Sequence, residues 1–354
     1  MSEIKRQRNS AVELLRILCI LMVIAGHYYA HGIAYAIGAL NLETITPRLL
    51  FLQMIAFGAD IANDIFVIIS GYYMINSTQK DKRVLKLFCR MMFYAAVIVL
   101  VFHLADLKSF TSQNLIKLLL PFRSGENWFV TCYLLLCLLV PFINPFLKGL
   151  ESKAFVKLLI ILFFLRYATP LLGIKKFWST THGLEQFIFL YFVGAYIRLY
   201  GFQTKILQNP WIWRFLLLTT LSLWGILNIG LATMGIRTQN QQLISDITKY
   251  YPLFSILISS MLLIVTLGLK PFHCKFVNLI SGSVLSIYLI HDNSLVREYI
   301  WRTVSPNIDQ ISGNHVFVHM AEKVLLVFAV CVIIDQCRLW LIEKPIEKLI
   351  AKIK

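Results

Sequence analysis

The sequence predicts an all-α fold, a polytopic helical membrane protein with about ten transmembrane helices. Of its 354 residues, 58% are hydrophobic and only 15% are charged, and the mean hydropathy is +0.70. A soluble globular protein of this length is far less apolar. The apolar residues also gather in runs long enough to cross a hydrocarbon core of about 30 Å. No long polar segment interrupts them, so we expect one membrane-embedded domain over residues 1–354.

Ten apolar runs have the length and composition expected of transmembrane helices. They are Val12–His31, Leu50–Met74, Leu85–Leu104, Trp128–Leu147, Phe155–Leu172, Leu184–Gly201, Trp211–Thr233, Pro252–Leu269, Phe276–Asn293 and Val316–Ile342. Lys and Arg are more frequent in the loops on one side of this arrangement, the side that holds both ends of the chain. The positive-inside rule therefore places both termini in the cytoplasm, as an even number of spans requires.

The formal net charge of +16 does not indicate nucleic-acid binding, because the basic residues are scattered between apolar runs. We interpret them as topogenic charges and as contacts to anionic membrane lipids. The chain has seven cysteines and no C-x-x-C motif, so we expect free thiols rather than a disulfide framework or a zinc site.

The first apolar run carries ionisable side chains on one stripe. Arg16 and His27 are eleven positions apart, which is about three helical turns or roughly 16 Å along one face, and Glu13 falls near the same stripe. Each charge at the centre of a membrane helix costs about 2.5–3.5 kcal/mol. We therefore expect a polar track that lines a membrane-embedded site. The alternative is that Arg16 reaches the lipid phosphates and His27 is a packing residue.

His27 and His31 are spaced i, i+4, a spacing that suits a metal ion. The Glu of the zinc-protease pattern does not lie between them, so we expect no metal.

The second run carries Asp60 and Asp64 on one face. Paired carboxylates serve as a general base, a partner that orients a histidine or a proton relay. Alternatively, they mark the outer end of a span drawn too long. Ser70 and Gly71 further along the run favour close contact with another helix.

Two further residues are candidates for the site, but each also fits a purely structural role. Trp128 opens the fourth run, where tryptophan is also a common interfacial anchor. His291 closes the ninth run, where it also fits a capping or interfacial role. No phosphate-binding Gly-rich loop and no G-x-S-x-G motif is present.

Several segments, taken in order, resemble the acyltransferase 3 family of integral-membrane O-acyltransferases. They are Arg8–Arg16 continuing to Gly26 and His27, Asp64–Tyr72, Trp128 and Phe129 with Tyr133, Tyr191–Gly194, Tyr288–His291, and Glu343–Ile346. The resemblance covers most of the chain, apart from about Trp211–Leu269. It implies acyl transfer, usually of acetyl from acetyl-CoA, to hydroxyls of cell-surface glycans or their lipid-linked precursors. It also implies a plasma-membrane protein of bacterial type, with Arg16 and His27 as the core pair of the site.

The resemblance itself supplies only Arg16 and His27, and the following roles are our own mechanistic hypothesis. His27 is the general base or a transient acyl carrier, and Asp64 orients it. Arg16 contacts the CoA donor or the developing oxyanion. Lys82 and Arg83 hold the CoA diphosphate, unless they are topogenic only. The residues expected to bind substrate are Glu13, Trp128, Tyr133 and His291.

The intramembrane charges fit two other functions. One is a transporter, either a polysaccharide-precursor flippase or a proton-coupled exporter. The other is a non-catalytic scaffold of a glycan-assembly complex. The sequence leaves the acceptor sugar, the face of the membrane and the oligomeric state open.

Overall fold

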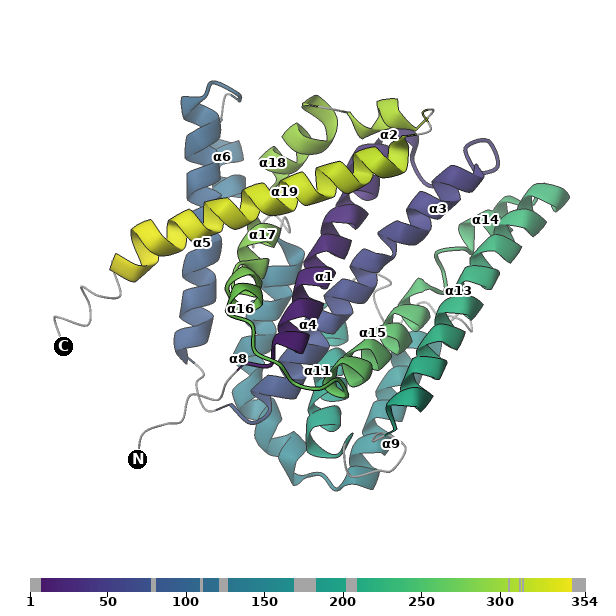
Figure 1. Cartoon of the computed structure of the whole chain (residues 1–354), viewed down its shortest axis with the longest axis vertical. Coiled ribbons are helices and arrows are strands. Elements are labelled where there is room, and N and C mark those ends of the chain that lie inside the picture. Colours follow the sequence, from purple (N-terminus) through teal and green to yellow (C-terminus); the bar gives the residue numbers. More distant parts are fainter. Residues whose placement is uncertain are drawn as a thin grey trace. The chain divides into compact units, whose positions relative to one another are not determined.

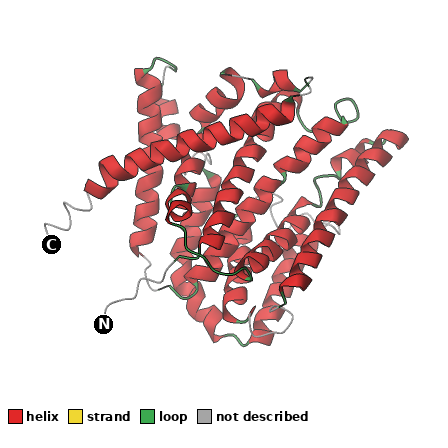
Figure 2. Cartoon of the chain, in the orientation of Figure 1, coloured by secondary structure: helices red, strands yellow, loops and turns green. Residues whose placement is uncertain are grey.

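The structure, a computed structural model, describes residues 8–77, 81–108, 111–120, 127–168, 183–201, 209–304, 306–311, 313 and 315–345. The described residues form helices joined by short turns and loops, and no strand is found among them (Figure 2). The predicted all-helical fold is therefore confirmed.

Six helical stretches are long and apolar enough to cross a membrane, and each coincides with an expected span. They are Ser10–Ile37, Pro47–Met74, Val84–Leu104, Trp128–Gly149, Pro210–Thr238 and Val316–Glu343. Lys275–His291 and Ser294–Gln310, bent by 76° at the break between them, make a seventh if they form one span. The chain is thus a multi-pass membrane protein, as predicted.

The number ten is not confirmed. The remaining expected spans fall on the bent pair, on helices of 16 and 17 residues, and on residues 152–168, where the described residues stop inside the expected span. With a rise of 1.5 Å per residue, the helices of 16 and 17 residues reach about 24–26 Å, which is less than the hydrocarbon core. A hydropathy window counts apolar residues but does not register where a helix breaks. Ten spans and cytoplasmic termini stay predictions.

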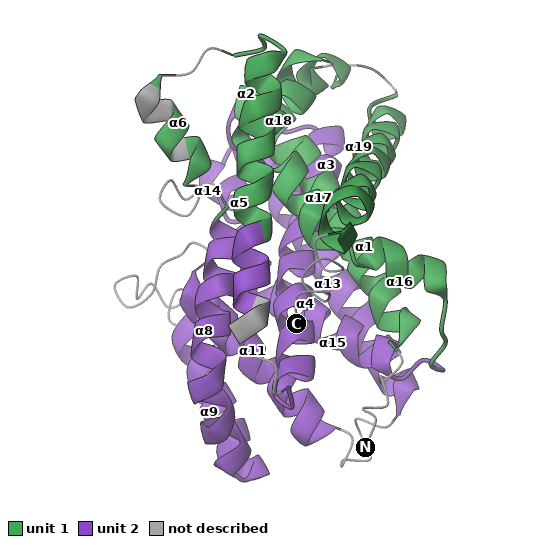
Figure 3. Cartoon of the chain, turned by 90° about the vertical axis from the view of Figure 1, so that its left-hand side faces the viewer, with its two compact units in different colours: residues 1–36, 90–127, 271–354 green, residues 37–89, 128–270 purple. Residues whose placement is uncertain are grey.

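Contacts divide the chain into two compact units, coloured separately in Figure 3. Unit 1 consists of residues 1–36, 90–127 and 271–354, and unit 2 of residues 37–89 and 128–270. Each unit is therefore assembled from segments far apart in the sequence. That residues 1–354 act as a single domain stays a prediction.

Unit 1 is built around the first helix, α1 (Ser10–His27), which packs against α16, α17 and α19 (Figure 1). Its α-helices are α1, α2 (Ala34–Ile37), most of α5 (Asp81–Leu104), α6 (Ser112–Leu119), α16 (Lys275–Ser281), α17 (Val284–His291), α18 (Ser294–Glu298) and α19 (Val316–Arg338). Shorter stretches are the π-helices η1 (Tyr28–Ile33), η4 (Tyr299–Thr303) and η6 (Leu339–Glu343) and the 3-10 helix η5 (Asn307–Gln310).

The start of α1 is tied to α16 and to the residue that precedes it. Asn9 caps the helix by accepting a hydrogen bond from the amide of Ala11. The hydroxyl of Ser10 donates to Asn278 Oδ1 at 3.0 Å and accepts from the amide of Cys274 at 2.8 Å. These bonds fix the N-terminal end of α1 against the C-terminal third of the chain.

Unit 2 contains a pair of helices in backbone contact, α4 and α11. Its helices are α3 (Pro47–Ala56), α4 (Gly58–Met74), the first turns of α5, α8 (Trp128–Gly149), α9 (Ser152–Phe163), η2 (Phe164–Ala168), α11 (Leu184–Leu199), α13 (Pro210–Thr238), α14 (Gln241–Ser245) and α15 (Tyr251–Leu267). A Cβ atom on Gly71 would overlap the carbonyl group of Tyr191, and one on Gly194 would overlap the carbonyl of Ile68. The close helix contact predicted at Gly71 is confirmed.

The exposed surface of α13 is apolar along most of its length. Trp211 is 71% exposed, Phe215 69% and Leu218 64%, and the helix has few buried residues. Such a surface is unfavourable in water but suits contact with lipid tails. This distribution supports the assignment of α13 to the membrane.

Replacing either contact glycine should weaken unit 2. We expect Gly71→Ala and Gly194→Ala each to lower the free energy of unfolding by about 1–3 kcal/mol, because the added methyl group meets backbone rather than a movable side chain. Thermal unfolding in detergent measures the change. Gly230→Ala on α13 is the control, since nothing lies within 4 Å of its added Cβ. Equal stability of all three variants would contradict the backbone contact.

Candidate active site

His27 is the last residue of α1 and is followed directly by the π-helix η1, which carries His31. The two imidazole ring centroids are 4.8 Å apart. A π-helical turn is rare and is frequently found at functional sites, because it shifts the side-chain register of a helix. The chain thus changes helix type at the point where it presents two histidines.

Side chains from the C-terminal third of the chain hold this π-helical turn in place. The carbonyl of Tyr28 accepts a hydrogen bond from Asn307 Nδ2 at 2.9 Å, and the carbonyl of His31 accepts one from Arg302 Nε at 3.0 Å. Gly32 leaves room for Asn307, since a Cβ atom there would overlap the amide side chain. Polar groups that a regular helix would pair internally are therefore paired across unit 1.

A hydrogen bond joins His27 to His291, the last residue of α17. His27 Nδ1 lies 3.0 Å from His291 Nε2, and His291 Nδ1 lies 2.6 Å from the carbonyl oxygen of Ile287. A carbonyl oxygen only accepts, so His291 Nδ1 carries a proton. In a neutral His291 the Nε2 atom is then a lone pair, and His27 Nδ1–H must be the donor. This arrangement leaves the lone pair of neutral His27 on Nε2.

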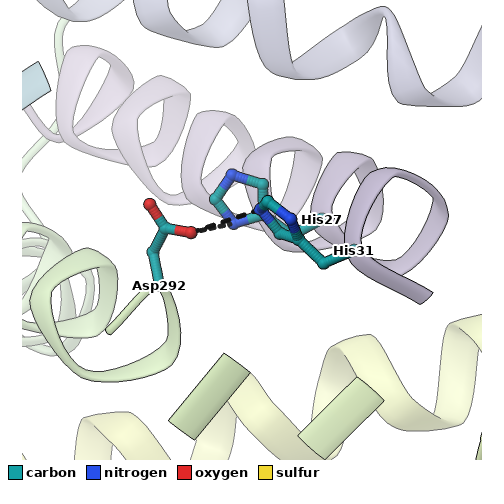
Figure 4. Close-up of side chains that lie close together, drawn as sticks. All are labelled: His27, His31 and Asp292. Carbon is teal, nitrogen blue, oxygen red and sulfur yellow. Dashed lines mark ion pairs between the residues drawn. The ribbon is translucent and has the colours of Figure 1, made fainter. Parts of the chain in front are cut away.

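Asp292, the residue after His291, places its carboxylate beside both His27 and His31. Figure 4 shows His27 and His31 projecting from one stretch of helix toward it. Its Oδ1 atom lies 3.5 Å from His27 Nδ1, 3.4 Å from His31 Nε2 and 3.4 Å from a terminal nitrogen of Arg297. The Asp292 side chain is only 4% exposed. A buried carboxylate in this position stabilises positive charge on a neighbouring imidazole.

Glu13 and Arg16 meet one turn apart near the start of α1. A guanidinium nitrogen of Arg16 lies 3.6 Å from Glu13 Oε2, which also accepts a hydrogen bond from the hydroxyl of Ser281. Glu13 is buried, whereas the Arg16 side chain is 33% exposed. The Nε–H of Arg16 is buried and has no hydrogen-bond partner among the described residues. Arg16 is thus oriented by Glu13, while part of its side chain stays accessible to an anionic ligand.

Asp64 lies in unit 2, on α4, inside a buried polar network. One carboxylate oxygen accepts a hydrogen bond from Gln186 Nε2 at 2.8 Å, and the other accepts one from Ser255 Oγ at 2.5 Å. Arg166 donates to the same Gln186. The network joins α4 to α11 and α15, so packing of unit 2 depends on it. That Asp64 orients His27 stays a prediction, and the carboxylate seen beside His27 is that of Asp292.

Trp128 and Tyr133 also lie in unit 2, both on α8. The Trp128 ring makes edge contacts with Phe129 and Phe187. The Tyr133 hydroxyl lies 3.1 Å from Ser70 Oγ. Their predicted substrate contacts stay predictions, as do those of Glu13 and His291. Lys82 and Arg83 fall in the first turn of α5, and their side chains lie outside the described residues.

Sequence reasoning named His27 and His291 separately and did not single out Asp292, Asn307 or Arg302. The signal for Asp292 was its place beside His291 at the end of an apolar run, where an acidic residue needs a partner. Asn307 and Arg302 gave no such signal, because their partners are backbone carbonyls released by an irregular helix.

Comparison with known proteins gives one match. A family model described as an acyltransferase domain, that of the acyltransferase 3 family, matches residues 9–335. The match includes every residue placed above at or near the site and spans segments of both units. No curated protein and no solved structure matches the chain.

The Asp64 network gives a test of what this carboxylate does. Asp64→Leu removes the carboxylate that accepts hydrogen bonds from Gln186 and Ser255, so we expect about 1–3 kcal/mol of lost stability for each lost bond. Asp64→Asn keeps an acceptor for Gln186, and its amide can donate to Ser255, so the melting temperature should stay near that of the parent. A stable Asp64→Asn protein without acyl transfer would instead place the carboxylate charge in the reaction.

Proposed function

Because the chain belongs to the acyltransferase 3 family, we propose that it transfers an acyl group from acyl-CoA to a hydroxyl of a cell-surface polysaccharide or its lipid-linked precursor. We propose acetyl as the acyl group and the bacterial plasma membrane as the location, as the family resemblance of the sequence implies. The multi-pass helical architecture supports a substrate held at a membrane.

The observation that carries the mechanism is the hydrogen-bonded pair of His27 and His291. A sugar hydroxyl is a weak nucleophile at neutral pH and needs a base within hydrogen-bond reach. With the Nδ1 proton of His27 given to His291, the Nε2 lone pair is available for this proton. His27 is partly exposed, with 17% of its side chain accessible, so the base is not sealed from a substrate.

In the proposed reaction the acceptor hydroxyl gives its proton to His27 Nε2 as its oxygen attacks the thioester carbonyl carbon. A carbon–oxygen bond forms, and the tetrahedral intermediate then breaks its carbon–sulfur bond. The leaving CoA sulfur takes the proton back from His27, so the products are the ester and free CoA. The Asp292 carboxylate stabilises the imidazolium that exists between the two proton transfers.

Arg16 is proposed to bind the CoA donor. Its orientation by Glu13 and the partial exposure of its side chain support contact with a phosphate or a carbonyl oxygen. Lys82 and Arg83 are proposed to add positive charge for the CoA diphosphate. Glu13 then acts through Arg16 as a positioning residue rather than as a direct contact to the sugar.

The first experiment compares two histidines one turn apart. Purified protein is given labelled acetyl-CoA and a glycan acceptor, and labelled ester is measured. We expect His27→Gln to lower kcat by about 10²–10⁴-fold, because the base is lost. His31→Gln, a matched change that takes no part in the proposed proton transfer, should keep turnover within about threefold on this scale.

Full turnover by a folded His27→Gln protein would overturn the proposed base. Movement of the glycan across vesicle membranes in the absence of acyl-CoA would favour a transporter instead. Release of CoA that depends on the acceptor would favour the enzyme.

The second experiment tests His291 as a positioning residue. His291→Phe removes the acceptor for His27 Nδ1–H, so we expect kcat to fall by about 10²-fold while KM for acetyl-CoA is unchanged. His291→Gln places an amide oxygen near the lost Nε2 and should restore most of the turnover. Equal loss in both variants, together with a lower melting temperature, would indicate a role in packing only.

A further inference from the structure

We propose that His27, His31 and Asp292 form a binding site for a divalent transition-metal ion of the zinc class. We further propose that occupancy of this site withdraws His27 from proton transfer. The first statement rests on geometry alone, whereas the second also rests on the proposed function.

The distances between the donor atoms carry the proposal. Zinc–nitrogen and zinc–oxygen bonds of about 2.0–2.2 Å in a tetrahedral site place neighbouring ligand atoms about 3.3–3.6 Å apart. Asp292 Oδ1 lies 3.5 Å from His27 Nδ1 and 3.4 Å from His31 Nε2. One ligand atom from each of the three residues lies within 4.8 Å of both others. Small side-chain rotations would close the widest separation around an ion.

The donor set suits this class of metal. Two imidazoles at i, i+4 with one carboxylate make three protein ligands, which is the usual number at a zinc site that keeps an open position. Imidazole nitrogen favours Zn²⁺, Ni²⁺ and Cu²⁺ over Mg²⁺ and Ca²⁺. His291 Nε2, 3.0 Å from His27 Nδ1, becomes available as a fourth donor once Nδ1 no longer donates to it.

Residues around the proposed ligands hold them in place, and the site is accessible. The side chains of Asn307 and Arg302 donate hydrogen bonds to carbonyls of the π-helical turn that carries His31, and the Ile287 carbonyl orients His291. Metal ligands typically have such outer partners. The His31 side chain is 24% exposed and Asp292 only 4%, so an ion can enter past the histidines onto a buried carboxylate.

Occupancy has a defined consequence for His27. A metal at Nδ1 uses the lone pair of that atom, so the single proton of the neutral ring must move to Nε2. The atom that should accept the hydroxyl proton then already carries one. The ion would therefore inhibit acyl transfer without blocking the acyl-CoA site, and a chelator would reverse the inhibition.

Direct binding is tested with the full-length protein in detergent, purified without a polyhistidine tag or metal-affinity step. The probes are Zn²⁺ in calorimetry and Co²⁺ in visible absorption, where tetrahedral coordination gives strong bands. We expect one ion per chain, with affinity lowered about 100-fold or more in His31→Gln, since loss of an outer partner alone costs 10–100-fold. His273→Gln, which removes an exposed histidine of the same unit, should bind like the parent. Equal binding by His31→Gln and the parent, or no binding by the parent, would overturn the site.

Acyl transfer is then measured with Zn²⁺ buffered around the measured Kd. Zn²⁺ should inhibit the parent and His273→Gln at similar concentrations. His31→Gln should need at least a tenfold higher Zn²⁺ concentration for the same inhibition, which would support the effect on His27. Undiminished transfer by zinc-loaded parent protein would overturn coordination through His27. Metal binding that depends on His31, in a protein that shows no acyl transfer even without metal, would sustain the site and refute the proposed function.

Discussion

The pairing of the polar groups of α1 with one C-terminal segment is the constraint on which the rest of unit 1 depends. In an apolar medium a buried polar group without a partner costs several kcal/mol, so each must be paired from another element. The pairs run along the helix: Ser10 with Asn278, Glu13 with Ser281, His27 with His291, and the Tyr28 carbonyl with Asn307. Segments about 270 residues apart in sequence are therefore held in one register.

This register determines the chemistry as well as the packing. A histidine that rotates freely offers either nitrogen to a substrate, whereas His27 has its Nδ1 side occupied by His291 and Asp292. His291 Nδ1–H donates to the Ile287 carbonyl, so the bond between the two histidines must run from His27 Nδ1–H to His291 Nε2. The same bonds that satisfy buried polar groups thus select the nitrogen of His27 that keeps its lone pair.

Two features of this arrangement could be predicted from the sequence, because they depend only on residues near one another in the chain. The stripe of Glu13, Arg16 and His27 follows from helical spacing, and the contact at Gly71 follows from the absence of a side chain. The partners could not be anticipated. The contacts of Ser281 with Glu13 and of Asp292 with His27 depend on which helices pack together. The periodicity of the sequence contains no such information. The π-helical turn was also hidden, since its cause is the set of side chains that take up its carbonyls.

The two buried aspartates show why residue type alone does not assign a role. Asp64 and Asp292 are both nearly inaccessible, yet Asp64 accepts hydrogen bonds from an amide and a hydroxyl, neither of which changes charge. Asp292 instead faces two imidazoles and a guanidinium through one oxygen. The hydrogen bonds that Asp64 accepts from Gln186 and Ser255 stabilise packing at every stage of a reaction. A carboxylate beside imidazoles also responds to their protonation or to a metal ion, so its partners, rather than its burial, couple Asp292 to the proposed chemistry.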